Sequence, residues 1–486
     1  MNTCFQAMSK PLGNKNWFKL SQIIFICLLA ATVFAGCAKQ KYQAKPISSQ
    51  RTSAKIFAKD ALSADFKAYL IKQGYKENEL PLASWGLNEL TASALFHHAK
   101  LDVAKAQLAL ANAQLETAGQ KQNPTLGGSI ARSNQANGDI RPWAYGLNVE
   151  IPIETAGKRQ IKIEQALHQQ EIARIDVAET AWQLRSQIAK DLLNYHENSA
   201  RQQLMQQEIN KQTDIINMLQ KRVEVGTLSN TEVLPSKLLL QTKQHALAAE
   251  QAKSQQIIAN LATDAGLTVE KFKQLPIKVL NVEANISAQT QTLNADTLKI
   301  LQEKALLNRL DIRRGLAKYA AVEANIKLEV AKQTPDISIT PGFIFDFGDK
   351  IWSLGFSSLL NLLNKNQTLI AEATQLREIE GAQFEALQAQ IIGDLSVANA
   401  RFVASQNNLS KAKLQQTAQQ VYLQKLNKQF AAGALDRLEL SQAAMQNHVA
   451  DMQVLNLQFE SLNAANALED LLQMPLDDNV NTLKFE

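Results

Sequence analysis

The side chains with the most obvious capacity for chemistry in this 486-residue sequence are its three cysteines and six histidines. Only His97 and His98 are neighbours, and adjacent side chains on a helix point about 100° apart, so no pair has the i, i+4 spacing of helical metal ligands. The sequence contains no glycine-rich phosphate loop, no Gly-x-Ser-x-Gly elbow and no Cys/His nucleophile pair. We therefore expect no catalytic residue, no cofactor and no metal site, and the chain is predicted not to be an enzyme.

The cysteines lie near the amino terminus, where their surroundings indicate targeting rather than redox chemistry. Residues 1–36 contain three lysines and no acid, and their apolar stretch at residues 23–33 is short for a membrane span. This order is typical of a secretory signal peptide. The segment ends Phe34-Ala35-Gly36-Cys37, which resembles a bacterial lipoprotein box, with Phe34 where leucine is usual. The resemblance implies a lipoprotein with Cys37 carrying acyl chains such as palmitate, and Ala38 fits sorting to the outer membrane.

The alternative for this segment is a plain signal peptide or an uncleaved anchor with an incidental cysteine. Cleavage before Cys37 would remove Cys4 and Cys27, which leaves no disulfide to form. It would also leave 48 basic against 46 acidic residues, so the net charge falls from +5 to +2. Because no run of Lys/Arg is longer than a pair, we expect no nucleic-acid partner.

An internal duplication runs through the rest of the chain. Four stretches recur in the same order about 207 to 211 residues apart, which chance rarely produces. The clearest pairs are Leu101-Asp102-Val103 with Leu310-Asp311-Ile312, Trp143-Ala144-Tyr145-Gly146 with Trp352-Ser353-Leu354-Gly355, and Gly226-Thr227-Leu228-Ser229 with Gly433-Ala434-Leu435-Asp436. The chain is therefore predicted to contain two copies of one unit.

Each copy is predicted to fold as helix, two strands, very long helix, tight turn and helix. The first helix covers residues 89–119, and apolar residues alternate with polar ones in the second strand, residues 143–153. Phe343, Phe345 and Phe347 alternate in the same way in the second copy, with a turn at Gly348-Asp349. Glu150 and Asp346 would face a lumen if their apolar neighbours face lipid.

Very long helices follow the strands. Residues 160–225 contain no Gly or Pro, and a helix of that length would span about 100 Å and pack lengthwise, as in a coiled coil. Gly226 and Gly433 would end the two long helices in left-handed conformation, and Ser229 and Asp436 would cap the next ones. Glu232 and Glu439 would complete capping boxes.

Four amphipathic strands cannot close a barrel, and an open sheet edge cannot exist in lipid. Three protomers would supply twelve strands, enough for a water-filled lumen. The predicted fold is mainly α with a membrane β-barrel part.

These features together resemble a known family, the TolC-like outer-membrane efflux proteins. The resemblance covers about residues 85–475, and it is carried by the duplication, by Trp85-Gly86-Leu87-Asn88-Glu89-Leu90-Thr91, and by Ile151-Pro152-Ile153-Glu154-Thr155-Ala156-Gly157-Lys158-Arg159. It implies a homotrimer whose twelve-stranded β-barrel, set in the lipid of a Gram-negative outer membrane, continues into a periplasmic α-barrel of twelve helices. It also implies a passive exit duct that works with a periplasmic adaptor protein and an inner-membrane pump of the RND type.

The resemblance divides the chain into a signal peptide (1–36), a lipidated segment (37–85), a first efflux repeat (86–267), an inter-repeat equatorial segment (268–294), a second repeat (295–474) and a tail (475–486). The strands would lie at about 124–153 and 335–360. The second copy's run at residues 360–366 lacks Gly-Lys-Arg, so only a similar turn into the helix is predicted there.

The helix turns are the implied functional sites. The adaptor-docking tips would be Val225, Gly226, Thr227, Leu228 and Ser229 in the first copy, and Ala432, Gly433, Ala434, Leu435 and Asp436 in the second. Opening requires breakable polar contacts, and the ionisable residues nearest the turns, Arg222, Asp436, Arg437 and Glu439, are the candidate gate. They could equally be solvated helix ends and caps.

Two other functions stay open. One is the outer-membrane channel of a type I protein secretion system, and the other is a lipid-anchored structural coiled-coil protein of the periplasm, although a coiled coil has no use for amphipathic hairpins. The exported substrate is also open: the Glu154–Arg159 run resembles outer components of heavy-metal efflux systems, but specificity resides mainly in the pump.

Overall fold

The computed structural model describes residues 42–134, 141–292, 295–359 and 364–474. The chain divides into two compact units, Met1–Lys55 and Ile56–Glu486. In the first unit the described residues include the start of helix α2 (Ser49–Phe57). The predicted signal peptide, Cys37 and the tail lie outside the described residues, as do residues 135–140 between the first two strands.

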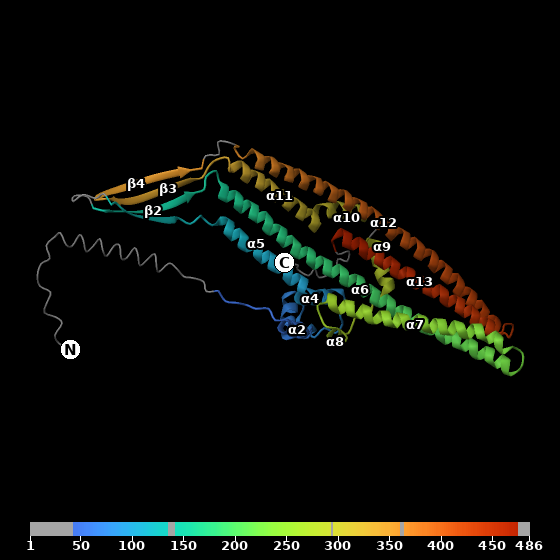
Figure 1. Cartoon of the computed structure of the whole chain (residues 1–486). Helices are drawn as coiled ribbons and strands as arrows, with labels where there is room; N and C mark the ends of the chain where they lie inside the picture. The colour runs from blue at the N-terminus through green and yellow to red at the C-terminus, as the bar shows by residue number, and fades with distance from the viewer. Residues whose placement is uncertain (1–41, 135–140, 293–294, 360–363, 475–486) are drawn as a thin grey trace, which may run out of the picture. The chain divides into compact units, whose positions relative to one another are not determined.

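Residues 56–486 are mainly helical (Figure 1). In each copy a very long helix is followed by a helix of about half its length. Among the described residues, no helix is both long and apolar enough to span a membrane. In chain order the helices after α2 are α3 (Ala64–Lys72), η1 (Glu77–Glu79), α4 (Leu87–His97), α5 (Ala99–Gly119), α6 (Lys158–Glu224), α7 (Asn230–Asp264), α8 (Val269–Phe272), α9 (Val282–Thr292), α10 (Ala295–Asn308), α11 (Leu310–Ala331), α12 (Gln367–Ala431) and α13 (Arg437–Leu472).

The strands are β1 (Thr125–Arg132), β2 (Trp143–Ile153), β3 (Ile337–Asp346) and β4 (Asp349–Ser358). They form one antiparallel sheet in the order β1-β2-β3-β4, so the pairing of β2 with β3 joins the two copies. The β3–β4 turn is formed by Phe347 and Gly348, which have φ values of +46° and +132°. The turn therefore lies one residue earlier than predicted, because Asp349 already pairs with Asp346.

Both predicted long helices are present. Helix α6 has 67 residues and α12 has 65, and within residues 56–486 each runs from the sheet to a tight turn (Figure 1). Helix α6 packs against α5 and α7 of its own copy and against α11 and α13 of the second copy, so it connects the two copies.

The predicted first helix, residues 89–119, is wrong in one respect, because it is broken at His98. His98 has an extended backbone, with φ −80° and ψ 126°, and its Nδ1 accepts the Lys100 N–H at 3.2 Å as an N-cap. Gly266 packs so closely here that a Cβ on it would lie 2.9 Å from the His98 nitrogen. The second copy has the same kind of break, at Arg309 between α10 and α11.

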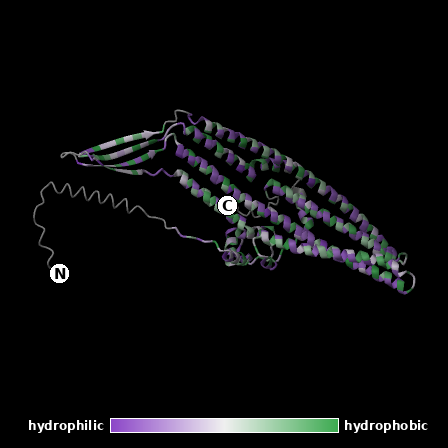
Figure 2. Ribbon diagram, viewed as in Figure 1, coloured by the Kyte–Doolittle hydropathy of each residue, from purple (hydrophilic) through white to green (hydrophobic). Residues whose placement is uncertain are grey.

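The core is divided among three clusters rather than gathered in one. The largest lies around α4, α6 and α7 and contains Phe66, Trp85, Leu90, Ile188 and Leu261. The other two lie along α12 and α13, and they contain Leu395, Phe402 and Leu468, and Leu409, Phe459 and Leu462. Polar and apolar residues alternate along the long helices (Figure 2), so each helix buries a narrow stripe.

Candidate membrane sheet and helix-tip sites

One face of the sheet carries mainly apolar side chains and is called the apolar face. Because side chains alternate, Trp143, Tyr145, Leu147, Ile151 and Ile153 of β2 share it with their register partners. Most of these large side chains are exposed, from 36% at Ile339 of β3 to 86% at Phe356 of β4. The apolar face consists of Leu126, Gly128, Ile130, Arg132, Trp143, Tyr145, Leu147, Val149, Ile151, Ile153, Ile337, Ile339, Pro341, Phe343, Phe345, Lys350, Trp352, Leu354, Phe356 and Ser358.

The opposite face is mostly small and polar. A Cβ on Gly127 would lie 2.5 Å from Asn148 Oδ1, and one on Gly342 would lie 3.4 Å from Asn148 Cβ, so two glycines make room for this amide. Glu150 and Asp346 lie on this polar face, opposite the apolar residues, as the predicted alternation requires. Both carboxylates would therefore meet water if the apolar face meets lipid.

An ion pair with a buried lysine connects the two copies where strands enter helices. Lys158, at the start of α6, is 5% exposed, and its Nζ donates to Asp336 Oδ1 at 2.7 Å and to the Thr334 carbonyl at 2.6 Å. Thr155 N–H donates to the same carboxylate oxygen at 2.9 Å. Partial burial would raise the pKa of Asp336, but the Lys158 and Thr155 hydrogen bonds outweigh it and hold the pKa below its usual value.

The second copy builds the same turn with other residues. Gly157 and Asn366 are both left-handed N-caps, with φ +69° and +58°, and each follows another left-handed residue, Ala156 or Lys365. Asn366 Nδ2 donates to Glu329 Oε2 at 2.9 Å. The turn into the helix is therefore similar, as predicted, while the buried lysine belongs to the first copy.

The two helix tips have nearly the same backbone. Gly226 and Gly433 both have φ +73°, at the left-handed position predicted for each. In the first tip Thr227 N–H donates to the Arg222 carbonyl, and in the second Ala434 N–H donates to the Gln429 carbonyl, both at 2.9 Å. These are Schellman motifs, and they set the same reversal in both copies.

Caps follow the tips. Ser229 and Asp436 accept hydrogen bonds from the backbone N–H groups of Thr231 and Leu438, two residues on. The predicted capping boxes are thus wrong in detail, because the caps bond the second helical N–H rather than the third. The remaining tip residues, Val225, Leu228, Ala432 and Leu435, lie in or beside the turns.

The candidate gate residues behave differently from one another. Arg222, in the last turn of α6, forms an ion pair with Asp436, the N-cap of α13, and this pair bridges the first tip to the second. The two side chains are 40% and 47% exposed. The Arg222 hydrogen bond, with the Leu438 N–H, holds the pKa of Asp436 below its usual value. Among the described residues, neither Arg437 nor Glu439 has an ion-pair partner.

Ion pairs along the seam between α6 and α11 were not predicted. Lys327 contacts Glu164 at 2.7 Å, and Arg313 contacts Glu171 at 3.2 Å. Arg314 contacts Asp176 at 3.3 Å and also pairs with Glu179, whose pKa is raised by burial despite the guanidinium. The pairs join residues more than 130 positions apart, so no local pattern in the sequence could indicate them.

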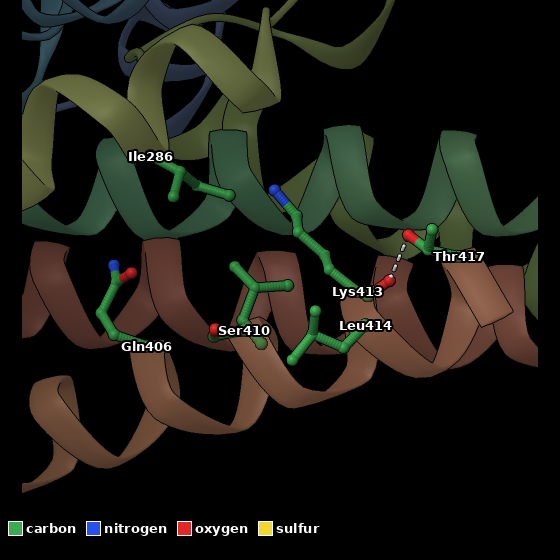
Figure 3. Close-up of a pocket in the computed structure, with 7 residues that line it drawn as sticks. Ile286, Gln406, Ser410, Lys413, Leu414 and Thr417 are labelled. Carbon is green, nitrogen blue, oxygen red and sulfur yellow. Dashed lines mark hydrogen bonds between the residues drawn. The ribbon is translucent and has the colours of Figure 1, made fainter.

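One shallow pocket lies between α9 and α12 (Figure 3). It is lined by Ile286 of α9 and by Gln406, Ser410, Lys413 and Leu414 of α12, and Leu414 is 71% exposed. Lys413 is its one ionisable lining residue, so no set of groups that could perform acid–base chemistry converges there. Within the described residues, no three His, Cys, Asp or Glu side chains are placed to hold a metal ion.

Known proteins share this architecture. Residues 90–267 match the model of a family described as outer membrane efflux protein. Comparison of the sequence with curated proteins finds no match. Solved structures of outer-membrane channels have the same fold, a duplicated helix pair carrying one four-stranded sheet.

Three solved structures illustrate the similarity. The outer membrane protein VceC of Vibrio cholerae is 17% identical, with 80% of this chain and 97% of VceC covered and a TM-score of 0.64. The outer-membrane channel OprN is 16% identical, with 90% of this chain and 99% of OprN covered and a TM-score of 0.65. The MtrE outer membrane channel of Neisseria gonorrhoeae, solved in an open state, is 18% identical, with 80% of this chain and 89% of MtrE covered and a TM-score of 0.61. The predicted resemblance to the TolC-like outer-membrane efflux proteins is confirmed, and this family consists of channels, not enzymes.

Proposed function

We propose that three copies of this chain form the outer-membrane channel of a tripartite efflux pump. The observation that carries the proposal is the apolar face, whose exposed side chains lie on a sheet with two open edges, β1 and β4. The four strands have 8, 11, 10 and 10 residues, close to the 9–11 that cross a bilayer. In lipid both edges must be paired, and twelve strands from three copies would close them into a barrel.

The helices would then form a periplasmic α-barrel in continuation of the β-barrel. Each chain brings α5, α6, α11 and α12 to the sheet, because these helices directly precede or follow its strands. Three copies would supply twelve helices. The ion pairs between α6 and α11 support a wall of fixed width, since each pair joins two neighbouring helices along their length.

The tips at the far end of the long helices would dock onto a periplasmic adaptor protein. Both tips present a small, exposed loop of Gly with short side chains, and Val225 is 73% exposed. The two copies repeat this surface with matching backbone geometry, so one adaptor surface could fit both. The adaptor would connect the duct to an inner-membrane pump of the RND type, which supplies the energy.

The ion pair between Arg222 and Asp436 would keep the tips together at rest. Both side chains are at least 40% exposed, so water can replace the contact when the tips separate. Arg437 and Glu439 would act in contacts between copies or as solvated helix ends. Lipidation of Cys37 would add an anchor in the outer membrane, and the substrate would be set by the pump.

Conductance of the purified full-length protein in planar bilayers tests the channel. The wild type should insert as a trimer with low resting conductance, and Arg222→Gln should raise that conductance severalfold. Lys221→Gln, at the neighbouring position without an ion pair among the described residues, is the control. A protein that never conducts, even with Arg222→Gln, would exclude the channel.

Crosslinking in cells tests the docking. Photo-reactive residues at Thr227 and Ala434 should capture an adaptor subunit, whereas one at Leu110 of α5, which is 59% exposed and far along the chain from either tip, should not. Mass spectrometry identifies what is captured. Capture of an exported protein instead would favour the secretion channel, and digestion of residues 125–153 by protease in intact outer membranes would favour a periplasmic coiled coil.

A further inference from the structure

Charged side chains are sorted between the two faces of the sheet. The strands carry three acids, Glu150, Asp346 and Asp349, and strand register puts all three on the polar face. Arg132 and Lys350 lie on the apolar face, opposite Trp143 and Phe345 respectively. The apolar face therefore holds cations and no carboxylate, although it is the face least suited to isolated charge.

The cations are also confined to one end of that face. Arg132 ends β1, Lys350 is the second residue of β4, and Arg141 lies two residues before β2. These positions are at the strand connections, the end of the sheet away from the helices (Figure 1). At the helix end the same face carries Ile153, Ile337 and other apolar residues, and no cation.

Aromatic rings hold two of the three cations in place. The Arg132 guanidinium lies 5.5 Å from the centre of the Trp143 ring, and that of Arg141 lies 5.8 Å from the Phe345 ring. Tyr145 stacks on Phe345, the ring beneath Arg141, with centroids 4.8 Å apart. All three cations are exposed, and among the described residues none of them forms an ion pair. Their positive charge is thus available to a ligand.

We propose that Arg132, Arg141 and Lys350, with the rings between them, bind the phosphate groups of a lipid headgroup in the leaflet away from the helices. The inference rests on the proposed function, since the apolar face must lie in lipid. Acyl chains would cover Leu147, Leu354 and their neighbours, while the phosphates would reach the three cations at the rim. A headgroup with two phosphates would fit best, because cations approach from β1, from the start of β2 and from β4.

The chemistry distinguishes this ligand from others. A neutral lipid would cover the apolar residues but leave three cations without counter-charge, and a soluble anion would leave the aromatic and aliphatic surface exposed. Cations near an anionic lipid surface each strengthen binding by about fivefold, so three together should contribute about 100-fold. The absence of acids from this face removes competition for the phosphates.

The test uses the full-length protein in detergent, with lipid A, which carries two phosphates, as the probe. Native mass spectrometry measures the lipid retained per protein. The triple variant Arg132→Gln/Arg141→Gln/Lys350→Gln should bind about 100-fold more weakly. Lys350→Gln alone, which disturbs no ring contact, should bind about fivefold more weakly. Lipid A without its phosphates should bind the wild type as weakly as lipid A binds the triple variant.

The matched control changes the same charge at the opposite end of the sheet. Lys121, Arg159 and Lys365 are exposed or half-buried near the points where strands meet helices, and their change to Gln should leave lipid A binding unaltered. Equal loss in this control, or equal binding of the dephosphorylated lipid, would overturn the proposal. Phosphate-dependent binding by a protein that does not conduct in bilayers would instead contradict the channel function alone.

Discussion

The two copies are joined by one cation–carboxylate pair at each end of the long helices, and the cations of the two pairs differ in burial. At the strand end Lys158 is 7% exposed in its side chain and its partner Asp336 also accepts from Thr155. At the tip Arg222 and Asp436 are 40% and 47% exposed. The carboxylates of the two pairs are about equally exposed, and only the cation at the strand end is shielded from water. The pair with the buried cation can therefore act as a fixed joint, and the pair with the exposed cation as a releasable contact.

The comparison predicts the largest loss of stability at the strand end. Lys158→Met keeps much of the buried volume but leaves Asp336 and the Thr334 carbonyl without their donor. Asp336 stays 45% exposed, so water can hydrate its carboxylate and offset part of the lost interaction. We expect the free energy of unfolding to fall by about 2 kcal/mol. Guanidinium unfolding at fixed protein concentration, followed by circular dichroism, measures the change.

The neighbouring Arg159, which has no ion pair among the described residues, is the matched control. Arg159→Met should leave the midpoint nearly unchanged. In an Asp336→Asn background the cost of Lys158→Met should shrink, because the charge that Lys158 neutralises is gone. Equal destabilisation by Lys158→Met and Arg159→Met would show that the ion pair is not a fixed joint.

The next effect concerns the backbone of the tips. Gly226→Ala and Gly433→Ala should each destabilise the local turn by about 1 kcal/mol, because an L residue at φ +73° is strained. Nothing lies within 4 Å of the Cβ that either change would add, so the strain is the whole effect. Amide hydrogen exchange at the ends of α6 and α12 measures it. A large difference between the two variants would contradict the equivalence of the tips.

The elements of this fold could be predicted from the sequence because their signals are local. The glycine-free run before Val225 indicated α6, and the Gly226 and Gly433 positions indicated both tips. The break at His98 was not predicted, and the residue that packs closely against it, Gly266, is 168 positions away in sequence. The Lys158–Asp336 pair could not be predicted either, because Asp336 is in the other copy. Lys158 itself lies in the Ile151–Arg159 run that carries the family resemblance.

The candidate gate residues show the same limit. Arg222, Asp436, Arg437 and Glu439 were chosen together because they lie near the turns. Which of them are in contact depends on how the helices pack. Arg222 and Asp436 are in contact because the packing of α13 against α6 brings the second tip's cap beside the first tip's last turn. Position in the sequence can therefore propose the members of an ionic contact, but helix packing selects the pair.

The smallest effect on stability should come from the tip pair. Asp436→Asn keeps the Oδ1 acceptor of the N-cap and removes only the charge that Arg222 contacts, so the unfolding midpoint should not change measurably. Resting conductance in bilayers should rise all the same. Ser229→Ala, which removes the other tip's cap and leaves the ion pair intact, should not raise it.

Acid should mimic this substitution. A carboxyl whose pKa is depressed in the folded protein keeps its ion pair above its usual pKa and loses the pair only when the pH falls through the lower, folded value. For Asp436 the usual value is 3.8 and the Arg222 hydrogen bond depresses it, so conductance should stay constant from neutral pH to about pH 4 and rise below that. Asp436→Asn should conduct equally across this range. A wild-type rise already near pH 6 would show that some other group, such as a histidine, controls opening, and would remove the tip pair from its role as the releasable contact.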